Sequence, residues 1–175
     1  MYIGHLGVAL AGKGLRRDAP LWLLVLATQG CDWFEVVACV GVPPGTSALW
    51  SHSIPAVLFL AGVLGVAAYR LTRDRGVALL VAAVTVSHLV ADFVTGLKPS
   101  WPGGPTIGLD LYSHPFGDFA VESVVLLAGW LIYRRSLLPE VRDAKLVWLL
   151  LVLLTTMQLA GAIALAHAAV PTKCR

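Results

Sequence analysis

The stretch GVALLVAAVTVSHLVADFVTG, residues 76–96, decides the fold and also raises the question of function. It is long and apolar enough to cross a bilayer as a helix. It nevertheless contains an imidazole, His88, and a carboxylate, Asp92. Ionisable side chains are costly inside membrane spans and tend to face a protein interior or a cavity. Because these two lie four residues apart, a helix places them on one face, one turn from each other.

The composition of the whole chain agrees with a membrane protein. Hydrophobic residues make up 58% and charged residues 13% of the 175 residues, whereas soluble domains have about 45–50% apolar and about 25% charged residues. The formal net charge of +3 gives no support to nucleic-acid binding. Three scattered cysteines do not indicate a disulfide framework.

Long apolar segments predict an all-α, polytopic membrane helix bundle that forms a single integral-membrane domain, residues 1–175. The predicted spans are the five segments 20–42, 54–69, 76–97, 116–133 and 145–170. The apolar stretch 2–12 is too short to cross a bilayer. We therefore expect five transmembrane helices plus an N-terminal half-helix.

Basic residues predict the orientation of this bundle. Ten of the 13 Lys and Arg residues fall on one side of the predicted spans, and the positive-inside rule makes that side cytoplasmic. These ten are Lys13, Arg16, Arg17, Arg70, Arg73, Arg75, Arg134, Arg135, Arg142 and Lys145. The chain is then a multi-pass protein of the bacterial inner (cytoplasmic) membrane, and its C-terminus and the loop 98–115 face the periplasm.

Helical rise allows the depth of the polar residues to be compared. Measured from the nearest cytoplasmic basic residue, His88, Asp32, Asp118 and His52 lie about 20–27 Å along their helices. The sequence therefore predicts that these side chains meet at one level, near the outer edge of the hydrocarbon. His5 lies only about 12 Å from Lys13, so it joins this level only if the half-helix is tilted or lifted.

The residue types at this level predict a metal site. Five of the ten acidic residues lie within predicted spans, with no Lys or Arg expected beside them. Two HxxxD units occur, SHLVAD at 87–92 and SHPFGD at 113–118. Mixed imidazole and carboxylate donors suit zinc, which we favour, or manganese or iron. The candidate ligands are His5, Asp32, His52, His88, Asp92, His114 and Asp118, and the candidate catalytic acids or bases are Asp32, Glu35 and Asp118.

Simpler interpretations exist for several of these residues. His88 and Asp92 alone could form a hydrogen-bonded pair that holds helices together. Glu35 and Glu122 are expected to support ligands rather than to bind an ion, and Lys98 is expected to be a solvated loop residue.

The order of these motifs resembles a known family. His5, Asp32, His52-Ser53, Ser87-His88-xxx-Asp92 and Trp101-Pro102 are similar to motifs of the inner-membrane metal-dependent hydrolase family, often described as LexA-regulated. That family is distantly similar to zinc-dependent phospholipase C, in which helices supply His and Asp ligands to a metal cluster. The resemblance covers residues 1 to about 120.

Two motifs depart from the family pattern. Where the family has Pro-Asp-x-Asp, this chain has Cys31-Asp32-Trp33-Phe34, so a second carboxylate is missing unless Glu35 replaces it. Where the family has His-Arg-Gly-x-Thr-His-Ser, residues 47–53 read SALWSHS, without the upstream His and Arg.

The resemblance implies a membrane-embedded, metal-dependent hydrolase-like protein. Its expected substrate is a phosphoester or similar bond of a lipid or lipid-linked molecule at the outer face. The alternative is a non-catalytic accessory or structural subunit of a larger membrane protein complex that retains the fold. The expected partners are membrane lipid and, for the second function, other membrane-protein subunits.

Overall fold

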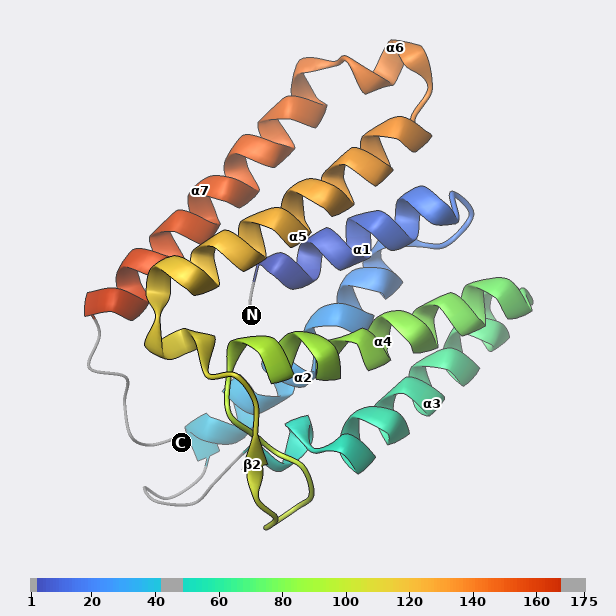
Figure 1. Ribbon diagram of the computed structural model, residues 1–175. Coiled ribbons are helices and arrows are strands. Elements are labelled where there is room, and N and C mark those ends of the chain that lie inside the picture. Colours follow the sequence, from blue (N-terminus) through green and yellow to red (C-terminus); the bar gives the residue numbers. More distant parts are fainter. Residues whose placement is uncertain (1–2, 42–48, 168–175) are drawn as a thin grey trace.

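The computed structural model describes residues 3–41 and 49–167 and is almost entirely helical (Figure 1). The helices are α1 (Gly4–Leu15), α2 (Leu21–Gly41), α3 (Ile54–Thr72), α4 (Arg75–Thr95), α5 (Pro115–Ser136), α6 (Pro139–Arg142) and α7 (Lys145–His167), with short 3-10 turns η1 (Leu49–His52) and η2 (Leu111–Ser113). Two strands of two residues, β1 (Lys98–Pro99) and β2 (Thr106–Ile107), pair antiparallel. This small hairpin was not expected from the sequence.

Within the described part of the chain, four helices are long and apolar enough to cross a membrane: α3, α4, α5 and α7. Many of their large apolar side chains face outward, such as Phe59, which is 75% exposed, and Leu79, which is 71% exposed. Outward-facing apolar surface of this extent is typical of helices in lipid. The all-helical architecture with several helices that could span a membrane is therefore confirmed, whereas the number of five spans stays a prediction.

Helix α1 is too short to span and is held inside the bundle by close packing on α5. A Cβ on Gly129 of α5 would lie 1.9 Å from the carbonyl oxygen of Gly7, and a Cβ on Gly14 would lie 2.8 Å from that of Ile132. Glycine at these positions lets the two backbones touch, as is common between membrane helices. The buried Glu122 also accepts a hydrogen bond from the backbone N–H of Gly4 at 3.0 Å, which satisfies one free donor of the helix N-terminus.

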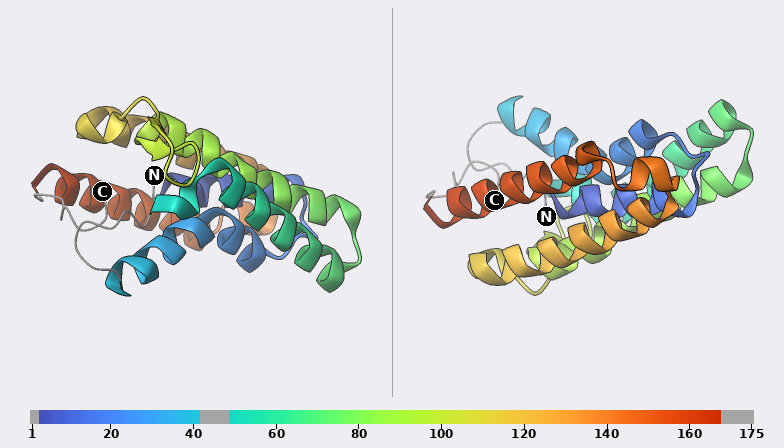
Figure 2. Two further views of the ribbon diagram at one scale, coloured as in Figure 1. Left: turned by 90° about the horizontal axis from the view of Figure 1, so that it is seen from below. Right: turned by 90° about the horizontal axis from the view of Figure 1, so that it is seen from above.

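The chain turns sharply between α3 and α4. Arg73 ends α3 in the left-handed conformation, and the side chain of Asp74 accepts hydrogen bonds from the backbone N–H groups of Gly76 and Val77. Arg16 binds the other Asp74 oxygen at 2.6 Å and so ties the α1–α2 loop to this turn. Figures 1 and 2 show that this loop, the α3–α4 turn and α6 all lie towards one end of the bundle. The ten basic residues of the predicted cytoplasmic side lie in these segments or in the adjoining helix ends.

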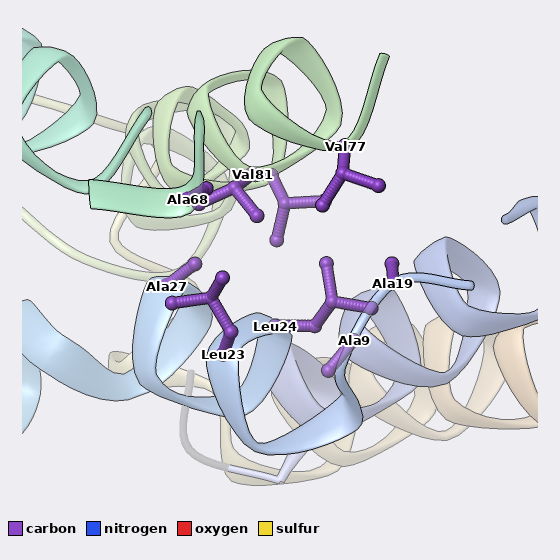
Figure 3. Packing of buried hydrophobic residues seen from close by; sticks show 9 residues of the cluster. Ala9, Ala19, Leu23, Leu24, Ala27, Ala68, Val77 and Val81 are labelled. Atoms are coloured by element: carbon purple, nitrogen blue, oxygen red, sulfur yellow. The ribbon is translucent and has the colours of Figure 1, made fainter. Parts of the chain in front are cut away.

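A core of small and branched side chains joins α1, α2, α3 and α4 (Figure 3). It consists of Ala9, Ala19, Leu23, Leu24, Ala27, Ala68, Val77, Val81 and Val84. Along α4 the buried stripe then changes from apolar to polar, through Thr85, His88 and Asp92. Along α2 it changes in the same direction, from Ala27 to Thr28 and Asp32. The same helix faces that build the core therefore carry the polar residues to one level.

Candidate metal centre

Five buried residues from four elements form one polar cluster. They are His5 of α1, Asp32 of α2, His52 of η1, and His88 and Asp92 of α4. The three histidines are each 1% exposed, and Asp32 and Asp92 are 6% and 2% exposed. The imidazole rings of His5 and His88 stack at 4.2 Å between centroids, and those of His52 and His88 lie 5.1 Å apart. No Lys or Arg of the described residues makes an ion pair with these five.

The two carboxylates lie between the histidines. Asp32 Oδ1 is 3.2 Å from His52 Nε2 and 3.8 Å from His88 Nε2, and Asp32 Oδ2 is 3.6 Å from His5 Nε2. Asp92 Oδ2 is 3.2 Å from His88 Nε2 and 3.8 Å from His52 Nε2. The Nε2 atoms of His52 and His88 therefore face both carboxylates, and that of His5 faces Asp32.

The hydrogen bond at the far side of His88 sets its tautomer. His88 Nδ1 lies 3.1 Å from the backbone carbonyl oxygen of Thr28. A carbonyl oxygen only accepts, so Nδ1 carries the proton. A neutral His88 then presents the lone pair of Nε2 to two carboxylates, which is unfavourable unless a cation lies between them. Metal-bound histidines commonly donate their other N–H to a backbone carbonyl in this way.

His52 has a similar partner at its far side. Its Nδ1 lies 3.1 Å from Glu35 Oε2 and 3.1 Å from Ser51 Oγ. Because a carboxylate only accepts, Glu35 favours a proton on Nδ1, whereas the hydrogen bond between Nε2 and Asp32 Oδ1 at 3.2 Å requires a proton on Nε2. A bound cation would take the place of the Nε2 proton and leave the Nδ1–H to Glu35. Lys98 of β1 in turn lies 3.6 Å from the same Glu35 oxygen.

Several cluster atoms lack a hydrogen-bond partner although they are buried. Among the described residues these include His5 Nε2, Asp32 Oδ2, His88 Nε2 and both carboxylate oxygens of Asp92. Their contacts of 3.2–3.8 Å are close but not aligned as hydrogen bonds. Four ligands around zinc at about 2.1 Å are themselves about 3.4 Å apart in a tetrahedron. The spacing of the cluster therefore fits ligand atoms around a cation.

Two overlapping groups of side chains can hold an ion. His5, His88 and Asp92 form one, and Asp32, His52 and His88 form the other, with the chosen ligand atoms of each group within 4.8 Å of one another. The two groups share His88. The cluster thus offers one site of up to five donors or two adjacent sites, and nitrogen and oxygen donors suit zinc, manganese and iron.

The second HxxxD unit does not join this cluster. His114 is exposed, and within the described chain no ion pair or metal-ligand group connects Asp118 with the five residues. Asp118 is buried beside Glu122, and its Oδ1 has no hydrogen-bond partner. The prediction that His114 lies with the other ligands is therefore not supported by its position. Pro115 disfavours helix at the preceding residue, so His114 stays outside α5 and the four-residue spacing does not create a shared face.

Three contacts of the cluster were missed by sequence reasoning. The Thr28 carbonyl could not be identified because backbone groups leave no signal in a sequence. Ser51 gave no distinctive pattern. Lys98 was expected to be solvated, but its side chain is only 16% exposed and pairs with Glu35, so the expectation that no basic residue meets the intramembrane acids was wrong for Glu35. Positions 42–48, which include part of the departing 47–53 motif, lie outside the described residues.

A cavity of about 290 Å³ borders the cluster. Its lining residues are His52, Ile54, Leu89, Val90, Asp92, Phe93, Lys98, Pro99, Ser100 and Ile107. They come from η1, the start of α3, the end of α4 and the β1–β2 hairpin. Two cluster residues, one lysine and several apolar side chains therefore border one space.

Comparisons with family models, with curated proteins and with solved structures found no match to this chain. The resemblance to the inner-membrane hydrolase family therefore stays a hypothesis. The geometry itself establishes that buried His and Asp side chains of this protein could hold a metal ion.

Proposed function

We propose that this chain is a membrane-embedded, metal-dependent hydrolase of the type that its motifs resemble. It cleaves a phosphoester or similar bond of a lipid or lipid-linked substrate at the outer face of the bacterial inner membrane. One observation supports the metal above all others: His88 donates from Nδ1 to the Thr28 carbonyl and turns an unpaired Nε2 towards Asp32 and Asp92.

The membrane arrangement is part of the same proposal. Helix α2 has 21 residues and acts as a fifth span beside α3, α4, α5 and α7, while α1 remains a half-helix. The basic segments lie in the cytoplasm and the cluster near the periplasmic headgroups. At that height a lipid phosphoester is within reach, whereas transporter sites usually lie near the midplane.

Each cluster residue has a role in this function. His5, His52, His88 and Asp92 hold the ion, which when bound polarises the substrate and lowers the pKa of a water ligand. Asp32 contacts all three histidines, and its unpaired Oδ2 can bind the ion or take a proton from the attacking water. Glu35 orients His52 rather than acting as the base, because its carboxylate contacts His52 and Lys98. Asp118 is not needed.

Purified protein tests this function directly. Protein loaded with zinc, manganese or iron should release product from a phosphatidylglycerol-type phosphodiester. EDTA should abolish the release, and reloading should restore it. The matched His88→Ala protein should lack both metal and turnover. Wild-type protein that binds no metal under any loading condition would refute the proposal.

The burial of the three histidines favours a second candidate. Rings that are 1% exposed resemble a closed structural metal site, which keeps no open position for substrate. In that case the chain is an accessory subunit that retains the fold and the ion. It would then copurify in fixed stoichiometry with other membrane proteins, bind metal and show no EDTA-sensitive turnover.

A further inference from the structure

We propose that the substrate is a phosphate-bearing membrane lipid that enters the cavity sideways between the start of α3 and the end of α4, and that Lys98 binds its phosphate. This inference rests on the proposed hydrolase function and specifies the substrate class and the route by which it reaches the cluster.

The mouth of the cavity is apolar and faces the surroundings of the bundle. Ile54 is 40%, Val90 66%, Phe93 45% and Ile107 42% exposed, and all four line the cavity. Val90 and Phe93 belong to a helix that can span the membrane, so they face lipid. An acyl chain entering here stays in contact with apolar groups, whereas a water-soluble phosphoester would have to cross them.

The inner end of the cavity, in contrast to the apolar mouth, is polar and charged. His52 and Asp92 of the cluster line it, and Lys98 is the one basic residue of the lining. Within the described residues the Lys98 ammonium has a single ionic contact, Glu35 at 3.6 Å, and makes no hydrogen bond. The N–H donors that do not face Glu35 are therefore available to phosphate oxygens.

The hairpin that carries Lys98 is fixed to both helices of the mouth. The backbone N–H of Ile54 donates to the carbonyl oxygen of Ser100 at 3.2 Å, and that of Leu109 donates to the carbonyl oxygen of Phe93 at 2.7 Å. The position of the ammonium group thus depends on the same elements that form the cavity. A cation held beside a metal centre is suited to position a phosphodiester and to offset its charge.

The reaction that follows is a simple hydrolysis. The oxygen of water bonds to phosphorus, the bond between phosphorus and the leaving alcohol oxygen breaks, and a proton from that water passes to the leaving alcohol. No redox partner is required.

Lipid retention tests the binding site without requiring turnover. Wild-type and variant proteins in nanodiscs of digalactosyldiacylglycerol, a bilayer lipid without phosphate, with a minor fraction of phosphatidylglycerol are extracted with mild detergent. Retained lipid is measured by native mass spectrometry, and bound metal is measured on the same samples. Lys98→Gln removes the cation and Lys98→Arg retains it. Val90→Trp fills the mouth, and its matched control is Val124→Trp, because Val90 and Val124 are both 66% exposed.

Wild type, Lys98→Arg and Val124→Trp should retain phosphatidylglycerol. Lys98→Gln should retain about tenfold less because it loses a charge-assisted contact, and Val90→Trp should also retain less because its ring fills the mouth. Metal content should stay equal in all five proteins. Dibutanoyl phosphatidylglycerol, which is water-soluble and has the same headgroup, should be retained at least tenfold less than the long-chain lipid by every variant, in line with the loss of buried methylene groups.

The outcomes separate the two proposals. If wild type binds metal but Lys98→Gln and Val90→Trp retain as much lipid as wild type, the lipid route is wrong and the hydrolase proposal stands. If the short-chain compound binds as well as the lipid, the site recognises free phosphoesters and the membrane route is also wrong. Absence of metal from wild type would instead overturn the function on which this inference rests.

Discussion

The two HxxxD units have the same spacing, but only the first places both of its residues in the buried cluster. In α4, His88 and Asp92 lie on one helical face, and both belong to the buried cluster that could hold a metal ion. In the second unit, His114 is exposed at the N-cap of α5, with φ −124° and ψ 76°, and only Asp118 is buried. The difference lies in Pro115, which starts the helix after the histidine. A four-residue spacing predicts a shared face only where both residues are inside one helix.

The largest expected change in metal affinity distinguishes His88 from His114. His88→Ala should weaken metal binding by about 100-fold or more, because His88 belongs to both possible ligand groups and lost ligands cost more than the 10–100-fold typical of their supporting residues. His114→Ala should bind metal like wild type. Elemental analysis and competition with a chelating dye measure both. Equal losses in the two variants would mean that the units are equivalent after all.

The next largest change in metal affinity distinguishes Asp92 from Asp118. Asp92→Asn should weaken metal binding by about 10–100-fold, since an amide oxygen replaces a carboxylate that faces His88 and His52. Asp118→Asn should leave metal binding within about twofold of wild type, because its carboxylate does not contact the cluster. The same dye competition applies. A clear loss in Asp118→Asn would place the second carboxylate in the centre.

A smaller effect concerns Glu35, which lies beside His52 of the cluster and, in the described part of the chain, has no counterpart at the second HxxxD unit. Glu35→Gln should weaken metal binding by about tenfold, because an amide orients the His52 ring less strongly than a carboxylate. Glu140→Gln, on the exposed helix α6, is the matched control and should have no effect. If Glu35→Gln binds metal normally but loses turnover, Glu35 acts in the reaction rather than in positioning His52.

The smallest effect contrasts the buried cluster with exposed charges at the other end of the bundle. The Arg16 guanidinium hydrogen-bonds Asp18 and lowers the pKa of that carboxyl to about 2. A lowered folded-state pKa contributes stability that is present above the usual pKa near 3.8 and is lost as the pH falls towards 2. Because Asp18 is exposed, solvent screens this pair. Asp18→Asn should therefore lower the melting temperature only slightly at pH 7 and still less as the pH falls through 2.

These contrasts also show which structural features a sequence pattern can predict. Apolar runs predicted the helices well: 20–42, 54–69, 76–97, 116–133 and 145–170 correspond to α2, α3, α4, α5 and α7 within a few residues. The reason is that a helix in lipid must satisfy all of its own backbone hydrogen bonds. Its length and composition can therefore be read from a continuous stretch of the sequence. Helical rise then placed Asp32, His52 and His88 at one level, and the structure brings these three together.

The remaining features depended on contacts between segments that are distant in the sequence. The close packing of α1 on α5, which includes the backbone contact between Gly7 and Gly129, brings α1 to the depth at which His5 stacks on His88. Only the packing of α2 on α4 brings the Thr28 carbonyl to His88 Nδ1, and only the β1–β2 hairpin turns Lys98 inward to Glu35. The sequence by itself determined the helices and the types of donor atom, because both follow from local chemistry. The tertiary structure decided which donors meet, because close helix packing and backbone hydrogen bonds have no local signature.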